Sequence, residues 1–435
     1  MKRRTFLAGL AASPFTFLSR PVTAEIGGRY SVVLGPNDGH NLQLSIMHRR
    51  EEDLRYYLRL DQSGFAAAAS SVQTFRRDDS VWAVTHVSFA DLPEYVPCTF
   101  LIENTAGFVL DVRPVRWLDR RIVRPRIAMV SCAAGYFYNP EIWQNLNQSN
   151  PDLVLFLGDN VYGDRPNMLT KRPANPRQLW QQYVAGRQEY DFYFRRELIP
   201  CLATWDDHDY GVDDGDRTYR YAKESLETFH IFWAQNPGLL NNLRGGPGVS
   251  CSLHAFGMDF VMLDGRSFRT GLGEFGEQPT IWGEAQRQWL DRQLKARTCP
   301  MWIANGQQFF GGYRRKYAVN YEFTLDYEWL VAAVRGRERS VGFLSGDVHF
   351  SEIMEIEADI LGYPTVELTS SSMHSVTFPG QHNWHHNPRR RAATSRHNFL
   401  VMQLAVGEEL LHGTVSCVGA QGELVFQHNI FLGRR

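Results

Sequence analysis

Four short segments of the sequence carry side chains of the types that bind metal ions in proteins. They are Ser131-Cys132, Gly158 to Asp164, Trp205 to Asp209 and Ser345 to His349. Together they offer a thiol, a phenol, imidazoles and carboxylates, the ligand types of transition-metal and hard-cation sites. We interpret this combination as a binuclear metal site.

The candidate ligands divide by chemical hardness. The thiolate, phenolate and imidazole of Cys132, Tyr162 and His349 suit a transition metal such as iron or zinc. The carboxylates of Asp207 and Asp347 are oxygen-only ligands, which suit calcium, magnesium or manganese. We therefore expect one half of the site to hold a softer ion and the other half a harder one.

Asp159 is the candidate bridge between the two ions. Its carboxylate, the two other carboxylates, the thiolate and the phenolate would together carry five negative charges. Such a cluster would repel itself strongly in a desolvated crevice without cations. One trivalent and one divalent ion would neutralise it, and two divalent ions with Tyr162 protonated would nearly do so.

A carboxylate-bridged pair of metals has a characteristic chemistry. Ions roughly 3.5 to 4 Å apart generate hydroxide at neutral pH and clamp both oxygens of an in-line displacement at phosphorus. The ligand set therefore predicts phosphoester hydrolysis by a metal-bridging hydroxide.

Each of the four segments follows a short apolar run. The runs are Ile127 to Val130, Leu153 to Leu157, Leu202 to Trp205 and Val341 to Leu344. Their length and composition predict strands that are buried on both faces. Because the carboxyl ends of such strands form the binding edge of an open α/β sheet, we expect the distant segments to share one crevice.

The start of the chain has the features of a twin-arginine export signal. Arg3-Arg4 precede an apolar stretch of about 14 residues, and Val22-Thr23-Ala24 offers a small-residue cleavage site. The stretch is shorter than the roughly 20 residues that span a bilayer. We expect the twin-arginine machinery to export the chain to the periplasm or the cell exterior, with residues 1–24 removed and no transmembrane segment left. The alternative is a chance arginine pair.

Composition indicates a globular chain that is long enough for two domains. It has 435 residues, of which 43% are hydrophobic and 21% charged. The 46 Lys and Arg residues are balanced by 47 Asp and Glu residues, so no basic excess suggests a nucleic-acid-binding surface. An oxidising compartment would permit disulfides among the six cysteines, but their spacing does not give the pairing.

The chain changes character near residue 125. Residues 27–115 hold seven short runs with β character and no convincing helix, which is typical of a β-sandwich of immunoglobulin or fibronectin type. Residues 125–430 alternate strands with helices, expected near 139–148, 176–198, 218–235, 284–296 and 326–336, and become β-rich after His349. We interpret His382 to Arg391 as a solvated loop, with a ligand cluster as the alternative.

The motifs resemble those of a known family. The set SC, GDNVYGD, WDDHDYG, LDGR and SGDVHFSE resembles the PhoD-like alkaline phosphatases, a branch of the metallophosphoesterases related in site architecture to purple acid phosphatases. The resemblance covers most of the chain, including the export signal and the N-terminal β region. It implies an α/β (α+β) β-sheet sandwich flanked by helices, preceded by a small all-β domain.

The resemblance also implies a ligand set. In it, iron(III) is held by Cys132, Asp159, Tyr162 and His349, and calcium by Asp159, Asp207 and Asp347. Zinc, manganese and magnesium are the alternative ions.

The same resemblance implies roles for four further residues. His208 would contact the phosphate of the substrate, where it would stabilise charge or protonate the leaving group. The guanidinium of Arg266 suits a phosphate and a structural carboxylate equally well. Asn160 and Asp206 would contact the metal ligands rather than the metals and hold those ligands in position.

Three functions follow from these features. The first is an exported phosphomonoesterase or phosphodiesterase, and the second is a phospholipase or teichoic-acid phosphodiesterase. The third is a non-catalytic exported binding module that keeps its metals for stability.

Each residue also has an ordinary structural interpretation, since Cys132 alone would be a core cysteine, Tyr162 a packing aromatic and Asp159 a turn residue.

Overall fold

The computed structural model describes residues 28–61, 66–271, 278–296, 298–312, 318–335, 337–384, 386–406 and 410–433. The expected export signal, residues 1–24, lies outside these ranges, as does residue 27, the first of the expected N-terminal domain. Over the described ranges, no helix has both the length and the apolar character needed to cross a membrane.

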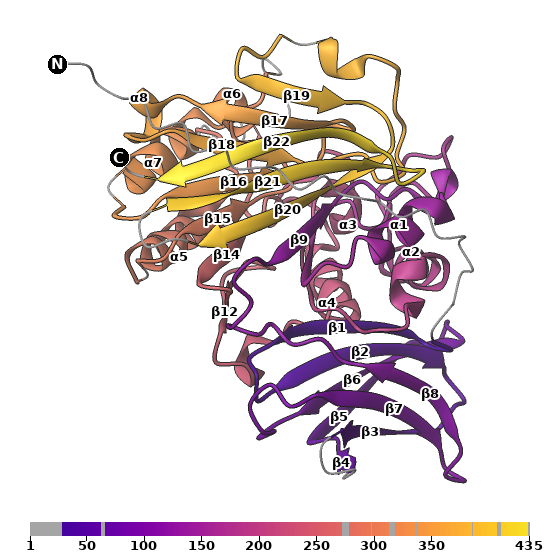
Figure 1. Ribbon diagram of the computed structural model, residues 1–435. Helices are drawn as coiled ribbons and strands as arrows, with labels where there is room; N and C mark the ends of the chain where they lie inside the picture. Colours follow the sequence, from indigo (N-terminus) through magenta and orange to yellow (C-terminus); the bar gives the residue numbers. More distant parts are fainter. Residues whose placement is uncertain are drawn as a thin grey trace, which may run out of the picture.

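Two four-stranded antiparallel sheets form the first part of the chain (Figure 1). In spatial order, one consists of β1 (Ser31–Asn37), β2 (Leu42–Arg49), β6 (Trp82–Phe89) and β5 (Ser71–Arg76), and the other of β4 (Ala66–Ala68), β3 (Leu54–Leu60), β7 (Cys98–Asn104) and β8 (Val109–Pro114). Leu44 from the first sheet and Phe100 from the second belong to one buried cluster. The seven expected runs are strands, β4 is an addition, and the immunoglobulin or fibronectin type stays a prediction.

A six-stranded mixed sheet follows. Its order is β11 (Cys201–Thr204), β10 (Leu153–Leu157), β9 (Arg126–Val130), β20 (Asn398–Val406), β21 (Leu410–Gly419) and β22 (Leu424–Gly433). Strands β9, β10 and β11 are parallel, whereas β20, β21 and β22 continue the sheet in antiparallel pairs. The described residues after 398 are therefore mainly strands, in agreement with the β-rich character expected after His349.

An eight-stranded mixed sheet faces the six-stranded one. Its order is β12 (Leu243–Gly245), β13 (Cys251–Ala255), β14 (Met258–Met262), β15 (Met301–Ala304), β16 (Val341–Ser345), β18 (Thr365–Thr369), β17 (Ser351–Ile356) and β19 (Arg390–Thr394). Leu155 and Leu400 of one sheet share a buried cluster with Phe260 and Leu344 of the other. The main core thus lies between the two sheets.

Helices cover the outer faces of this sandwich (Figure 1). The six-stranded sheet is covered by α1 (Pro140–Gln148), α2 (Pro176–Glu189) and α4 (Ala222–Phe232), and the eight-stranded sheet by α5 (Gly283–Ala296) and α7 (Thr324–Arg335). The shorter helices are α3 (Asp207–Tyr210), α6 (Val319–Glu322) and α8 (Ala358–Leu361), and the 3-10 turns are η1 (Gly135–Phe137), η2 (Asp191–Phe194), η3 (Pro237–Leu239) and η5 (Gln381–Asn383). The expected sandwich flanked by helices is what the described residues form.

Local differences from the sequence-based expectations have simple causes. The helix expected over 176–198 ends at Glu189, because Asp191–Phe194 turns into η2. The patch from His382 to Arg391 is not entirely a solvated loop. Arg390 begins β19, an edge strand, and its Nε donates to the buried carboxylate of Glu352 at 2.5 Å.

Arg187 of α2 joins the first sheets to the rest of the molecule. Its fully buried guanidinium donates to the hydroxyls and carbonyl oxygens of Ser31 and Ser45, which lie on β1 and β2. It also donates to the carbonyl oxygen of Phe232 at the end of α4. One side chain therefore satisfies acceptors on two strands and a helix.

Candidate metal centre

Four of the predicted ligands have a left-handed backbone conformation. The φ angles are 59° at Cys132, 52° at Asp159, 71° at Asp347 and 57° at His349. Side chains other than glycine rarely adopt this region, and each instance costs on the order of 1 to 3 kcal/mol. These residues follow β9, β10 and β16, so the sharp turns after the strands direct the side chains toward one place.

One group of donors gathers around the thiol. A carboxylate oxygen of Asp159, Oδ2, accepts from the Tyr162 hydroxyl at 3.3 Å and from Cys132 Sγ at 3.5 Å. The Tyr162 hydroxyl also lies 3.2 Å from Nε2 of His349. Ligand atoms of Cys132, Asp159 and His349 lie within 4.8 Å of one another. The predicted ligands of the softer ion are therefore brought together.

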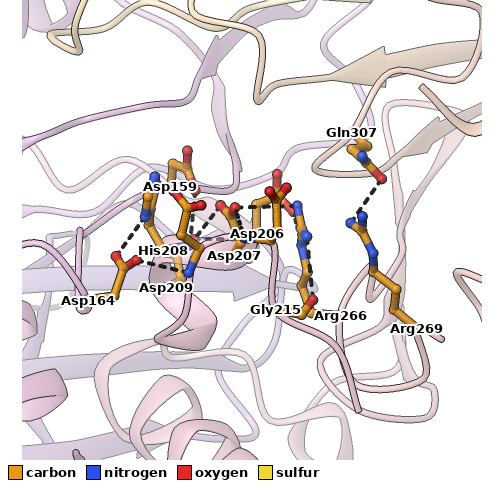
Figure 2. Close-up of polar contacts among 12 residues, drawn as sticks. Asp159, Asp164, Asp206, Asp207, His208, Asp209, Gly215, Arg266, Arg269 and Gln307 are labelled. Atoms are coloured by element: carbon orange, nitrogen blue, oxygen red, sulfur yellow. Dashed lines mark hydrogen bonds and ion pairs between the residues drawn. The ribbon is translucent and has the colours of Figure 1, made fainter. Parts of the chain in front are cut away.

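A second group shares Asp159 with the first. Ligand atoms of Asp159, Asp207 and His208 also lie within 4.8 Å of one another. The backbone N–H of His208 donates to Asp207 Oδ1 at 2.9 Å and reaches Asp159 Oδ1 at 3.4 Å (Figure 2). Asp159 thus directs Oδ2 toward the Cys132 thiol and Oδ1 toward Asp207 and His208. A ligand that bridges two metal ions needs this arrangement.

Asp347 is the one predicted ligand outside both of these close groups in the described residues. Its Oδ2 atom is buried and has no hydrogen-bond partner there. Its negative charge adds to the rise in the pKa of Cys132, so it lies within electrostatic reach of the thiol. A buried carboxylate oxygen without a donor fits a cation as its missing partner.

The electrostatics of the cluster fit bound cations. Burial, together with nearby negative charge, raises the pKa of Asp159, Cys132 and Tyr162 well above their usual values. Burial also lowers the pKa of His349 to about 4, which keeps the ring neutral and able to ligate. Cations would offset the crowded negative charge and hold the acids in their ionised, ligating forms.

His208 is held in a defined orientation. Its Nδ1 lies 2.7 Å from Oδ1 of the buried Asp164 (Figure 2). Its ring stacks on that of Tyr162, with the ring centroids 4.0 Å apart. Burial lowers the pKa of His208, but the charges of Asp207 and Asp159 and the bond to Asp164 together raise it to about 10. In the metal-free protein these neighbours therefore favour the positively charged imidazole.

Arg266 is directed at carboxylates rather than at open space. Its Nε donates to Asp206 Oδ1 at 2.5 Å, and Nη2 lies 3.9 Å from Asp207 Oδ2 (Figure 2). Both Arg266 and Asp206 are buried. A Cβ at Gly158 or Gly306 would lie only 2.7 Å or 2.4 Å from Asp206 side-chain atoms, so glycines allow this packing. We interpret Arg266 as holding the two aspartates in place.

Asn160 connects neighbouring turns. Its side-chain amide donates to the carbonyl oxygen of Thr204 at 2.9 Å, and its backbone N–H donates to Asp209 Oδ1 at 2.8 Å. The other oxygen of Asp209 accepts from the backbone N–H of Asp206 at 3.0 Å. Asp209 thereby fixes the turn after β10 against the turn after β11.

Comparison with known proteins gives a structural relative but no sequence relative. Neither the scan of family models nor the search of curated proteins finds a match. A solved structure described as the structure of PhoD superposes with a TM-score of 0.71 at 14% sequence identity, covering 92% of this chain and 88% of that one. This chain has the PhoD fold. The similarity inferred from the motifs is thus confirmed at the level of the fold.

A second solved structure is a conserved uncharacterized protein from Streptococcus pneumoniae TIGR4, described as a predicted phosphoesterase. It covers 71% of this chain and 99% of its own at 8% identity, with a TM-score of 0.26. That similarity is too small to carry an argument beside the PhoD superposition.

Two contributors to the PhoD-fold site were not predicted from the sequence. Asp164, the last residue of GDNVYGD, holds His208. Ser371, in the serine run after β18, has its Oγ 3.2 Å from Cys132 Sγ and accepts from the backbone N–H of His349 at 2.8 Å. Asp164 could have been found because it is the second aspartate of its motif. Ser371 had no signal in the sequence beyond a run of serines.

An exposed aromatic pair borders the site. Phe378 and Trp384 are 51% and 60% exposed, and their ring centroids lie 5.6 Å apart. Between them, the side chain of Gln381 donates to the carbonyl oxygen of Val348 at 3.2 Å, and Val348 is flanked by two predicted ligands. This chain thus carries an exposed apolar pair on the segment that contacts one of its candidate metal-binding turns.

Proposed function

We propose that the protein is an exported, metal-dependent phosphoester hydrolase of the PhoD-like alkaline phosphatase type, with a β-sandwich domain over 27–115 and a catalytic domain over 125–430. The observation that carries the proposal is the position of Asp159. One of its oxygens faces the thiol, phenol and imidazole donors, and the other faces Asp207 and His208. The PhoD fold supports the same reading.

The donor set assigns the ions to two halves. Cys132, Tyr162 and His349 would hold iron(III) or zinc, and Asp207 and Asp347 would hold calcium, magnesium or manganese, with Asp159 between them. When bound, the ions would supply an activated water and neutralise charge at phosphorus.

His208 supplies the protein's own contribution to the reaction. Asp164 occupies its Nδ1, which leaves Nε2 as the ring nitrogen able to reach a phosphate or leaving-group oxygen. The bond to Asp164 favours the protonated imidazole, which can donate a hydrogen bond or a proton to that oxygen. A purely structural metal site has no use for such a group, which argues against a non-catalytic binding module.

Hydrolysis of a chromogenic phosphoester by purified, metal-replete protein tests the proposal. We expect phosphate release, and a loss of at least roughly 100-fold in Asp159→Asn and His349→Ala, because each change removes a metal ligand. Asp78→Asn, at a fully exposed side chain, serves as the control and should keep full activity. Absence of activity on monoesters, diesters and phospholipids alike would overturn the proposal.

Phospholipid or other lipid-linked diester cleavage is the second candidate, and the aromatic pair Phe378 and Trp384 favours it. An apolar edge beside the site suits an ester with a large apolar group better than a small soluble one. Comparing hydrolysis of a phospholipid with that of a soluble monoester and a soluble diester, in wild type and in Trp384→Ala, decides between the two. Selective loss of phospholipid hydrolysis in the variant supports the lipid substrate.

A further inference from the structure

A second group of metal-binding side chains lies on the eight-stranded sheet, away from the centre described above. His254, Asp259 and Cys299 each offer one ligand atom, and the three atoms lie within 4.8 Å of one another. Nδ1 of His254 is 2.7 Å from Asp259 Oδ1 and 4.0 Å from Cys299 Sγ. We propose that these three side chains bind a divalent transition-metal ion of the zinc type.

The sheet itself aligns the three side chains. His254 on β13 pairs directly with Asp259 on β14, and Asp259 pairs with Met301 on β15. Cys299 lies two residues before Met301, in the segment that enters β15. Two neighbouring strands and the segment that enters a third therefore bring one candidate ligand each to the same place.

Backbone hydrogen bonds hold each ligand position. The N–H of His254 donates to the carbonyl oxygen of Asn242 at 2.8 Å, and that of Asp259 donates to Pro300 at 3.0 Å. The carbonyl oxygen of Cys299 accepts from the guanidinium of Arg337 at 2.6 Å. Little rearrangement is needed to close the three side chains around an ion, which keeps the cost of binding low.

The geometry fits coordination better than nucleophile activation. In a Cys–His–Asp catalytic arrangement, the thiol and the carboxylate contact opposite ring nitrogens. Here both approach Nδ1 of His254. A thiolate, an imidazole and a carboxylate are the ligands that zinc accepts, and three protein ligands leave the fourth tetrahedral position for water.

The cluster is open to solvent on one side. The side chain of His254 is 34% exposed, whereas that of Asp259 is 2% exposed. Cys299 is partly exposed, while the other five cysteines of the chain, all of them described and free, are buried. An ion can therefore enter from solution, and a thiol reagent can address Cys299 selectively.

Alkylation of Cys299 by iodoacetamide, followed by mass spectrometry of the full chain, tests the site. Zinc should slow modification of Cys299 at least tenfold relative to chelator-treated protein, because a coordinated thiolate does not attack the reagent. The protection should vanish in His254→Ala and in Asp259→Asn. His412→Ala, at an exposed histidine, is the matched control and should keep it. A rate that zinc leaves unchanged would overturn the proposal.

Zinc content provides an independent measurement. After dialysis at equal free zinc, wild type should retain one equivalent more than Cys299→Ser, and equal contents would also overturn the proposal. Because the site shares no residue with the catalytic proposal, Asp159→Asn should still show zinc protection of Cys299. Protein without phosphoesterase activity but with zinc protection of Cys299 would contradict only the proposed function. Active protein without that protection would contradict only the proposed zinc site.

Discussion

Single residues in the candidate metal centre depend on neighbours that fix their orientation and charge. His208 shows this most clearly, because Asp164 holds its Nδ1, and in the metal-free protein Asp207 and Asp159 also raise its pKa. Replacing Asp164 therefore changes the behaviour of His208 without touching a predicted metal ligand.

We predict that Asp164→Asn lowers the turnover number roughly 10- to 100-fold with a smaller effect on KM. Loss of the negative charge lowers the pKa of His208, so its protonated form is lost at a lower pH as pH rises. The pH profile of kcat should accordingly lose its alkaline side earlier than that of wild type. A profile with an unchanged alkaline side would mean that Asp164 has only a structural role.

The convergence of the candidate ligands could be predicted because thiol, phenol, imidazole and carboxylate groups follow four apolar runs. Their left-handed backbone conformations could not, because Cys132 and Asp347 have no local signal for a positive φ. Ser371 was missed for a related reason, since its contact with Cys132 joins residues 239 positions apart. Such contacts arise only when both strand ends have been placed.

Individual elements explain how the first sheets are attached to the rest of the chain. Helix α2 inserts Arg187 between β1, β2 and the end of α4. Burial lowers the pKa of this arginine to about 10, yet several acceptors surround it. Removing it would leave buried carbonyl oxygens without donors.

We predict that Arg187→Ala lowers the free energy of unfolding by about 3 kcal/mol or more, since two or more buried acceptors lose their donor. Arg187→Lys should recover only part of the loss, because an ammonium cannot reproduce the guanidinium fork. Urea denaturation of both variants measures the effect. Arg55→Ala, at an exposed position on β3, is the control and should change stability by less than roughly 0.5 kcal/mol. A similar loss of stability in Arg55→Ala would contradict the claim that the buried hydrogen bonds of Arg187 cause the effect.

The buried strands were the most predictable elements, whereas the short edge strands were not. β9, β10, β11 and β16 are mostly apolar and almost entirely buried, and they were expected. β12 has three residues, and β19 carries exposed and half-exposed arginines, so neither has the composition of a core strand. Both are strands because a neighbouring strand offers an edge to pair with.

At the scale of the whole molecule, the buried carboxyl groups of the candidate metal centre reduce stability when no cation is bound. Asp159 and Asp347 both have a pKa raised by burial and by neighbouring carboxylates. Their pKa in the folded, metal-free protein lies above that in the unfolded chain. These carboxyl groups ionise near pH 4 in the unfolded chain but only at a higher pH in the folded, metal-free protein. The metal-free fold therefore loses stability as pH rises from about 4 until it has passed the raised pKa values.

We predict that removing metal with a chelator lowers the melting temperature, and that the difference between metal-replete and metal-free protein widens as pH rises. Saturating an ion at 100 times its Kd contributes about 2.7 kcal/mol to stability. Calorimetry with and without chelator, from pH 5 to pH 8, measures the difference. Asp159→Asn should show a smaller gap, since it carries less buried charge and lacks the bridging ligand. A gap independent of pH would contradict the electrostatic account.

The two stacked sheets divide the ligands between them, with Cys132, Asp159 and Asp207 following strands of one sheet and Asp347 and His349 following a strand of the other. An ion that needs both sets can be captured only after the sheets have formed and docked. Loading of the proposed metals would therefore be a late event in the maturation of this chain. Metal content would distinguish finished molecules from those whose secondary structure is complete but whose layers have not yet assembled.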